Sequence, residues 1–171
     1  MTDASALATT GANARTVAAW LDRLDLVLGR LHAHLDVEHP GRTRPDPGGS
    51  ERWDDGQVWA HLAEFGDYWL AELRIVLGAQ SDEPVPFGRV KTDPVRIAAI
   101  EVGRDVAPHE HFATIERSAG DLRAVLVTMT DADWEHVGLH STLGEMSIDR
   151  QLDEFHIGHY EEHADQLDSI T

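Results

Sequence analysis

Near its end the chain reads Glu154-Phe155-His156-Ile157-Gly158-His159-Tyr160-Glu161-Glu162-His163-Ala164-Asp165-Gln166-Leu167. In a helix of about 3.6 residues per turn, this stretch extends an inward-facing stripe that begins at Ile148. Apolar residues occupy that stripe as far as Phe155, and His159 and His163 follow them on the same face. Because burial of a polar side chain is unfavourable unless the group has a partner, two inward histidines four residues apart predict a shared metal ion.

The rest of the sequence predicts further helices of similar length. Apolar residues recur every three or four positions, which is the pattern of an amphipathic helix. Asp54 and Gln57 have the spacing of a capping box at the start of one of them. The predicted helices cover about residues 13–35, 54–78, 108–129 and 147–170, with a short helix at 95–103. Long, irregular connections separate them, so the sequence predicts an all-α bundle with long loops.

The 171 residues are about the length of one domain, and the sequence contains no internal repeat. Residues 1–12 are mostly small and polar, which predicts a disordered tail rather than a secretion signal. A single domain is therefore expected over residues 13–171. No apolar run approaches the roughly 20 residues that a membrane-spanning helix needs.

The charge and the cysteine content of the sequence argue against several classes of binding partner and chemistry. The formal net charge is -17, from 31 Asp and Glu against 14 Lys and Arg, so nucleic acid and anionic membranes are not expected to bind. The absence of cysteine excludes disulfides, thiolate nucleophiles and cysteine-ligated zinc, and favours a cytoplasmic location. Any thiol chemistry would need sulfur from a small molecule. The 11 histidines are the main source of metal ligands and of acid and base groups.

A third ligand is available from the second helix. His61 lies about 60° from the centre of that helix's apolar stripe, at the edge of the core. His156 is an alternative member of the chelating pair, because it precedes His159 by three residues and lies on nearly the same face. The other interpretation is that the inward histidines only form hydrogen bonds, with Gln166, Glu162 and the backbone.

Three segments resemble the DinB/YfiT-like metalloenzyme superfamily: Gln57-Val-Trp-Ala-His61-Leu-Ala-Glu64, Leu143-Gly144-Glu145-Met146-Ser147 and His159-Tyr-Glu-Glu-His163-Ala-Asp-Gln166-Leu167. The resemblance extends over about Asn13 to Leu167. It implies a four-helix bundle of up-down-down-up topology with a divalent metal ion, zinc, nickel or iron, near one end. Carried over residue by residue, the implied ligands are His61, His159 and His163.

The resemblance also implies an activity on a small-molecule substrate. The superfamily includes mycothiol-dependent maleylpyruvate isomerase, through its N-terminal domain, and S-transferases that use mycothiol or bacillithiol. In the transferase hypothesis, the metal lowers the pKa of a low-molecular-weight thiol, and the thiolate attacks an electrophile. In the hydrolase hypothesis, the metal activates water. Glu64, three residues after His61 and on the same face, is the predicted catalytic carboxylate and is preferred to Glu162.

The competing hypothesis is a non-catalytic bundle whose metal is structural or absent. The superfamily often forms dimers through helix faces, so a homodimer is expected. Trp59 and Tyr160 lie off the predicted core stripes and are the candidate exposed aromatic residues for such an interface. Arg104, Arg117 and Arg123 are candidate anion binders, although a solvated charge is the preferred interpretation of each.

Overall fold

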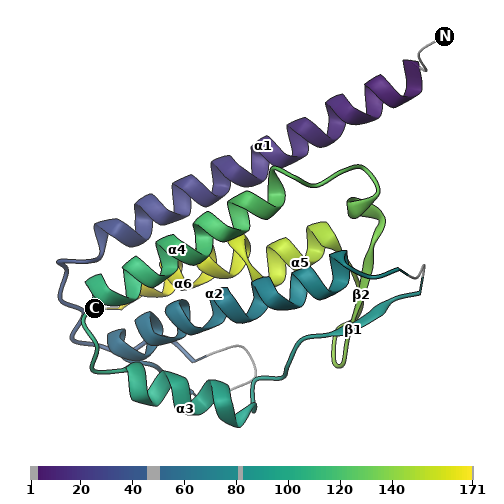
Figure 1. Cartoon of the computed structure of the whole chain (residues 1–171). Helices are drawn as coiled ribbons and strands as arrows, with labels where there is room; N and C mark the ends of the chain where they lie inside the picture. Colours follow the sequence, from purple (N-terminus) through teal and green to yellow (C-terminus); the bar gives the residue numbers. More distant parts are fainter. Residues whose placement is uncertain (1–3, 46–50, 81–82, 171) are drawn as a thin grey trace.

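The computed structural model describes residues 4–45, 51–80 and 83–170 of the chain (Figure 1). The helices are α1 (Ala4–Ala33), α2 (Asp55–Leu77), α3 (Pro94–Gly103), α4 (Pro108–Leu126), α5 (Ile148–Phe155) and α6 (Ile157–Ser169). The strands are β1 (Val85–Phe87), β2 (Val137–His140) and β3 (Gly144–Ser147), and a 3-10 turn, η1, spans Asp133–Glu135.

The helices form a four-helix bundle in which α5 and α6 together are the fourth member. Helix α1 and the α5–α6 pair run in one direction, and α2 and α4 run in the other, as Figure 1 shows. This arrangement confirms the predicted all-α bundle of up-down-down-up topology. Because α2 and α4 are parallel, the chain must travel back along the bundle between them. Residues 78–107, which include β1 and α3, make this return, and α3 packs against α2.

Helix α1 begins earlier than the sequence pattern predicts. It starts at Ala4 rather than Asn13, so residues 4–12, predicted as part of a disordered tail, are helical. Residues 1–3 of that tail lie outside the described residues. At 30 residues α1 is long, but neither it nor any other described helix is apolar enough over a sufficient length to cross a membrane.

A small sheet replaces the irregular connections predicted on either side of α3 and α4. Strand β2 pairs in parallel with β1, with Phe87 opposite His140, and antiparallel with β3, with His140 opposite Gly144. Strands of three or four residues are too short to show a clear alternation of polar and apolar positions, which explains why the sequence pattern did not indicate them. The sheet holds the connection that precedes α3 against the segment that leads into α5.

The last predicted helix is broken in two. His156, between α5 and α6, has φ −131° and ψ −100°, which is outside the helical region. A Cβ atom on Gly158 would lie 2.1 Å from the carbonyl oxygen of Asp153, so only glycine permits the two helices to meet this closely. The break sets the direction of α6, which carries His159 and His163.

The prediction that Trp59 and Tyr160 are exposed is wrong. Their exposed fractions are 0% and 2%, and the Tyr160 ring lies 4.6 Å from the ring of Phe65. Helix α2 packs against α3, α4 and α6, so its buried face is wider than a single stripe. These two aromatic residues therefore do not mark a dimer surface.

Gly66 tests how tightly α2, α4 and α6 pack. A Cβ atom there would lie 2.7 Å from the hydroxyl oxygen of Tyr160 and 3.0 Å from the Cβ of Ser118. Overpacking costs about 1–3 kcal/mol and the gain in helix propensity is about 1 kcal/mol, so Gly66→Ala is expected to lower the free energy of unfolding by up to about 2 kcal/mol. Gly120→Ala in α4, with no atom within 4 Å, is the matched control and should stabilise the protein slightly. Urea denaturation measures the free energy of unfolding of both variants. If both variants were stabilised equally, the close packing around Gly66 would be contradicted.

Candidate metal centre

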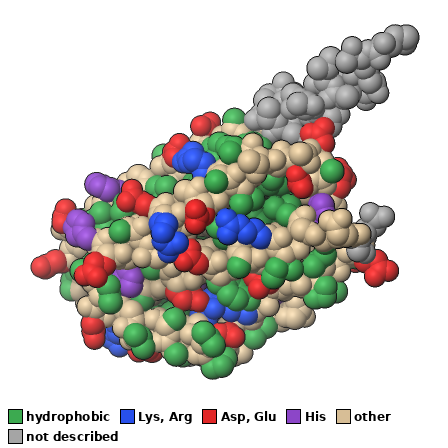
Figure 2. All heavy atoms as spheres, viewed as in Figure 1, with side chains coloured by type: hydrophobic (Ala, Val, Ile, Leu, Met, Phe, Trp, Pro, Cys, Tyr) green, Lys and Arg blue, Asp and Glu red, His purple; other side chains and the backbone are tan. Residues whose placement is uncertain are grey.

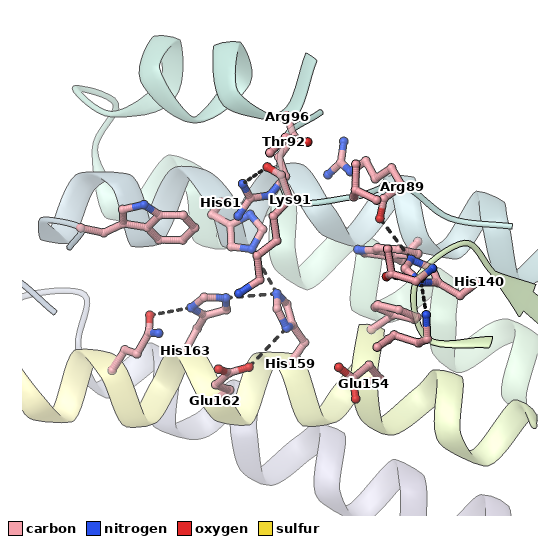
Figure 3. Close-up of a pocket in the computed structure, with 17 residues that line it drawn as sticks. His61, Arg89, Lys91, Thr92, Arg96, His140, Glu154, His159, Glu162 and His163 are labelled. Atoms are coloured by element: carbon pink, nitrogen blue, oxygen red, sulfur yellow. Dashed lines mark hydrogen bonds and ion pairs between the residues drawn. The ribbon is translucent and has the colours of Figure 1, made fainter. Parts of the chain in front are cut away.

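Helices α2 and α6 bring the three predicted ligands together (Figure 3). The Nε2 atom of His159 lies 3.0 Å from Nε2 of His61 and 3.1 Å from Nε2 of His163. The three rings are nearly perpendicular to one another, with interplanar angles of 83° to 88°. Each ring therefore directs the same nitrogen toward one point.

These separations suit a metal ion. Zinc–nitrogen bonds of about 2.0–2.1 Å in a tetrahedral site place two nitrogens about 3.3 Å apart, close to the separations here. Nδ1 of His163 lies 2.8 Å from Oε1 of Gln166, which can only accept a hydrogen bond, so Nδ1 carries the proton. The Nε2 atom of His163 then has a free lone pair that faces the other two rings.

Each of the three histidines has a hydrogen-bond acceptor three residues later in its helix. Such groups hold the Nδ1 proton of a metal-binding histidine and orient its ring. The distances from Nδ1 to the acceptor oxygen are 2.8 Å for His163 and Gln166, 3.6 Å for His159 and Glu162, and 3.8 Å for His61 and Glu64. The last two exceed hydrogen-bonding distance, and Nδ1 of His61 is buried without a hydrogen-bond partner. Gln166 therefore orients the His163 ring, and a carboxylate lies near each of the other two rings without a hydrogen bond to it.

Burial also keeps two of the ligands neutral. It lowers the pKa of His61 well below its ordinary value, and the charges of His163, His159, Arg96 and Arg89 lower it further. Burial and the neighbouring His159 lower the pKa of His163 to about 3. A metal ion requires the neutral imidazole, so no proton has to be removed from these two rings at neutral pH.

The alternative ligand, His156, is not part of this cluster. Among the described residues, the group of side chains placed to hold a metal ion is His61, His159 and His163. His156 is 3% exposed and lies at the break between α5 and α6. The break turns α6 relative to α5, so the step of three residues from His156 to His159 does not place both on one helical face.

The two carboxylates near the histidines have different surroundings. Glu64, the predicted catalytic residue, lies 2.6 Å from Arg89, and its side chain is 15% exposed. Glu162 lines the cavity beside the cluster and lies nearest to His159, and Figure 3 shows it next to that ring. The adjacent His159 ring and nearby positive charge, including that of Lys91, lower the pKa of Glu162 to about 2. The sequence interpretation related Glu162 to His163 and overlooked that it follows His159 by three residues.

A cavity of about 540 Å³ opens beside the three histidines. Its walls come from the connection between β1 and α3, from the turn between β2 and β3, and from α5 and α6. Three basic residues of its lining, Arg89 and Lys91 in that connection and Arg96 in α3, were not identified from the sequence. The signal for them was the chain's only lysine between two arginines.

The arginines that the sequence nominated as anion binders lie elsewhere. Each is paired with a carboxylate, and Figure 2 shows in general that basic groups lie among acidic ones on the face in view. The pairs are Arg104 with Asp54, Arg117 with Asp67, and Arg123 with Asp25.

The fold and the histidine cluster define a four-helix bundle of a known kind. The chain is similar to YfiT from Bacillus subtilis, described as "a probable metal-dependent hydrolase with an unusual four-helix bundle topology". The TM-score is 0.70 and the sequence identity is 19%, over 90% of this chain and 85% of that chain. No family model and no curated protein sequence matches this chain. At this identity the comparison shows a YfiT-like fold, and the relation to mycothiol-dependent isomerases stays a prediction.

Proposed function

We propose that this protein is a metal-dependent hydrolase of small molecules, with a divalent ion held by His61, His159 and His163. The observation that carries the proposal is the convergence of three Nε2 atoms on one point beside an open cavity. Three protein ligands leave further coordination positions for water or substrate, which is the pattern of catalytic rather than structural sites. The description of YfiT as a probable metal-dependent hydrolase supports the same activity for a chain of the same fold.

The chemistry of the site divides between the ion and the side chains. A bound divalent ion lowers the pKa of water and polarises a carbonyl or phosphoryl oxygen. Glu162 is ionised at neutral pH and lines the cavity, so its carboxylate is placed to accept the proton of an attacking water. The water oxygen forms a bond to the electrophilic atom, the bond to the leaving group breaks, and the proton passes from Glu162 to the leaving group.

Glu64 has a different role in this proposal from the one predicted. Its carboxylate is engaged by Arg89 at 2.6 Å, and it is absent from the described residues that line the cavity. It lies 3.8 Å from Nδ1 of His61. We therefore assign Glu64 as a positioning residue, which orients the His61 ring and anchors Arg89.

Thiol transfer remains the second candidate. A cavity of about 540 Å³ has room for a low-molecular-weight thiol together with an electrophile, and a chain without cysteine would take its sulfur from such a cofactor. Mycothiol and bacillithiol are the thiols to test.

A homodimer is also proposed, and light scattering in solution checks it.

The proposal is tested with untagged protein. Calorimetric titration with zinc, nickel or iron(II) is expected to show about one ion bound per chain. The loaded protein should then hydrolyse members of a panel of esters, amides and phosphoesters, and chelation should abolish turnover until metal is added back. A second panel tests thiol transfer, and in it the loaded protein is mixed with mycothiol or bacillithiol and an electrophilic arene.

Each result of that test has one interpretation. Metal-dependent hydrolysis supports the first proposal, and metal-dependent conjugation only in the presence of a thiol supports the second. Binding of one ion without turnover in either panel would favour a structural metal in a non-catalytic bundle. No bound ion would contradict the metal centre itself.

A further inference from the structure

The basic residues beside the histidines are unusual for this chain. Acidic residues outnumber basic ones by more than two to one in the sequence, yet Arg89, Lys91 and Arg96 line one cavity within eight residues. The carboxylates that line it are Glu154 and Glu162. The cavity therefore has a more positive balance of charge than the rest of the molecule.

The side chains of Lys91 and Arg96 extend toward the histidine cluster. In Figure 3, Lys91 reaches from the connection before α3 toward His159 and His163, and Arg96 lies near His61. The guanidinium of Arg96 also stacks over the ring of Trp53, 5.3 Å from its centroid. Both positive charges therefore lie beside the proposed metal position.

A divalent ion would add to this positive charge. Among the described residues that line the cavity, the carboxylates are Glu154 and Glu162, and imidazoles bind a metal ion in their neutral form, so positive charge would be in excess. Concentrated charge of one sign is unfavourable in a partly enclosed site unless an opposite charge enters. An anionic ligand supplies that charge.

Arg89 fixes the segment that carries the two cations. Its guanidinium is bound to Glu64 and lies over the ring of Tyr68, 3.9 Å from the centroid. Its carbonyl oxygen accepts a hydrogen bond from Nε2 of His140 at 3.1 Å, and Nδ1 of His140 accepts from the backbone N–H groups after β2. Gly88, with φ +86°, has no room for a Cβ atom, which would lie 2.6 Å from the His140 ring. The cations are thus held on a rigid base, which reduces the entropy lost on binding.

Part of the cavity lining is apolar. The rings of Trp69 and Phe155 stack with centroids 3.9 Å apart, and both line the cavity. Leu143, in the turn between β2 and β3, also lines it and is 38% exposed. This part of the lining suits the hydrocarbon part of a ligand.

We infer that the substrate is a small amphipathic anion, whose carboxylate or phosphate group binds Lys91 and Arg96 and whose apolar part lies on Trp69, Phe155 and Leu143. This inference rests on the proposed function, because the anionic group would lie beside the metal. Charge-assisted hydrogen bonds of this kind are worth about tenfold or more in affinity each.

The test uses three probes that share a phenyl group: phenylacetate, phenylphosphonate and the neutral phenylacetamide. Their affinities for the zinc-loaded full chain are measured by calorimetry. Both anions are expected to bind at least about tenfold more tightly than the amide. The anion that binds more tightly shows whether a carboxylate or a phosphate is preferred.

Variants separate the anion site from the metal. Lys91→Gln and Arg96→Gln are each expected to weaken anion binding about tenfold without weakening the binding of the amide or of zinc. Lys91→Arg should retain most of the anion affinity. Arg123→Gln is the matched control: it removes the same charge from a surface pair with Asp25 and should change nothing.

Two results would overturn the inference. One is equal affinity for the amide and the anions, and the other is a loss in the Lys91 and Arg96 variants no greater than in Arg123→Gln. The zinc titration tests the proposed metal centre independently, because a chain that binds no zinc contradicts that centre whatever its affinity for anions. If no zinc binds, the same probes and variants are measured on the metal-free chain, and the same criteria apply.

Discussion

Replacement of His163 by alanine is expected to weaken metal binding by at least about a hundredfold, and His61→Ala and His159→Ala should do the same. The change removes one of three convergent Nε2 atoms, and loss even of a group that only orients a ligand costs about 10–100-fold. Calorimetric titration with zinc measures the affinity directly. Thermal unfolding gives a second measurement, because metal at 100 times its dissociation constant stabilises the wild-type protein by about 2.7 kcal/mol and should stabilise the variants far less.

Two control variants accompany the ligand variants. His109→Ala removes an exposed histidine that lies 3.0 Å from Asp36 on the surface, and metal affinity should be unchanged. His156→Ala removes the competing candidate and should lower stability, since His156 is buried, while one ion per chain still binds. Retention of metal by all three ligand variants would refute the centre, and loss of metal in His156→Ala alone would move the site to His156 and its neighbours.

Trp59→Ala is expected to lower the free energy of unfolding by about 3–5 kcal/mol, the usual cost of truncating a fully buried tryptophan. The exposed fraction of Trp59 is 0%, and the side chain is among the largest that are fully buried. Urea denaturation followed by far-UV circular dichroism measures the effect.

Leu26→Ala is the matched comparison for Trp59→Ala. Leu26 is a large apolar residue of α1 that is 68% exposed, and its truncation should change stability by less than about 0.5 kcal/mol. If Trp59→Ala lowered the free energy of unfolding no more than Leu26→Ala does, the Trp59 side chain would lie at the surface. The dimer interface predicted from the sequence would then again be a candidate role for it.

Much of the bundle could be predicted because its signals are local. The capping box of Asp54 and Gln57 forms as expected, with hydrogen bonds of 3.1 and 3.2 Å, and Gly78 is the C-cap of α2. Apolar periodicity located the long helices. It did not reveal the second buried face of α2, because burial of Trp59 depends on α3, α4 and α6 being in place. The break at His156 was missed for a similar reason, since the inward-facing stripe of Phe155, His159 and His163 runs on across it in the sequence.

The centre was predicted in part. The spacing of His159 and His163 indicated two ligands, and the resemblance supplied His61, which the structure places 3.0 Å from His159 across the core. Which carboxylate lines the cavity depends on the tertiary arrangement, in which Arg89 engages Glu64 and leaves Glu162 at the rim. Each carboxylate follows a histidine of the cluster by three residues, so spacing within a helix gave no valid reason for the predicted preference for Glu64 over Glu162.

The ligands of this centre come from helices that are far apart in the chain. His61 and His159 are separated by 98 positions, and they meet only where α2 and α6 pack side by side. During synthesis on the ribosome, a nascent chain that has exposed α2 offers one imidazole, which is a weak chelator. Capture of the ion must wait until the closing helix has emerged and docked. The proposed ion would therefore bind after α6 has docked, and it would stabilise the folded bundle rather than start its folding.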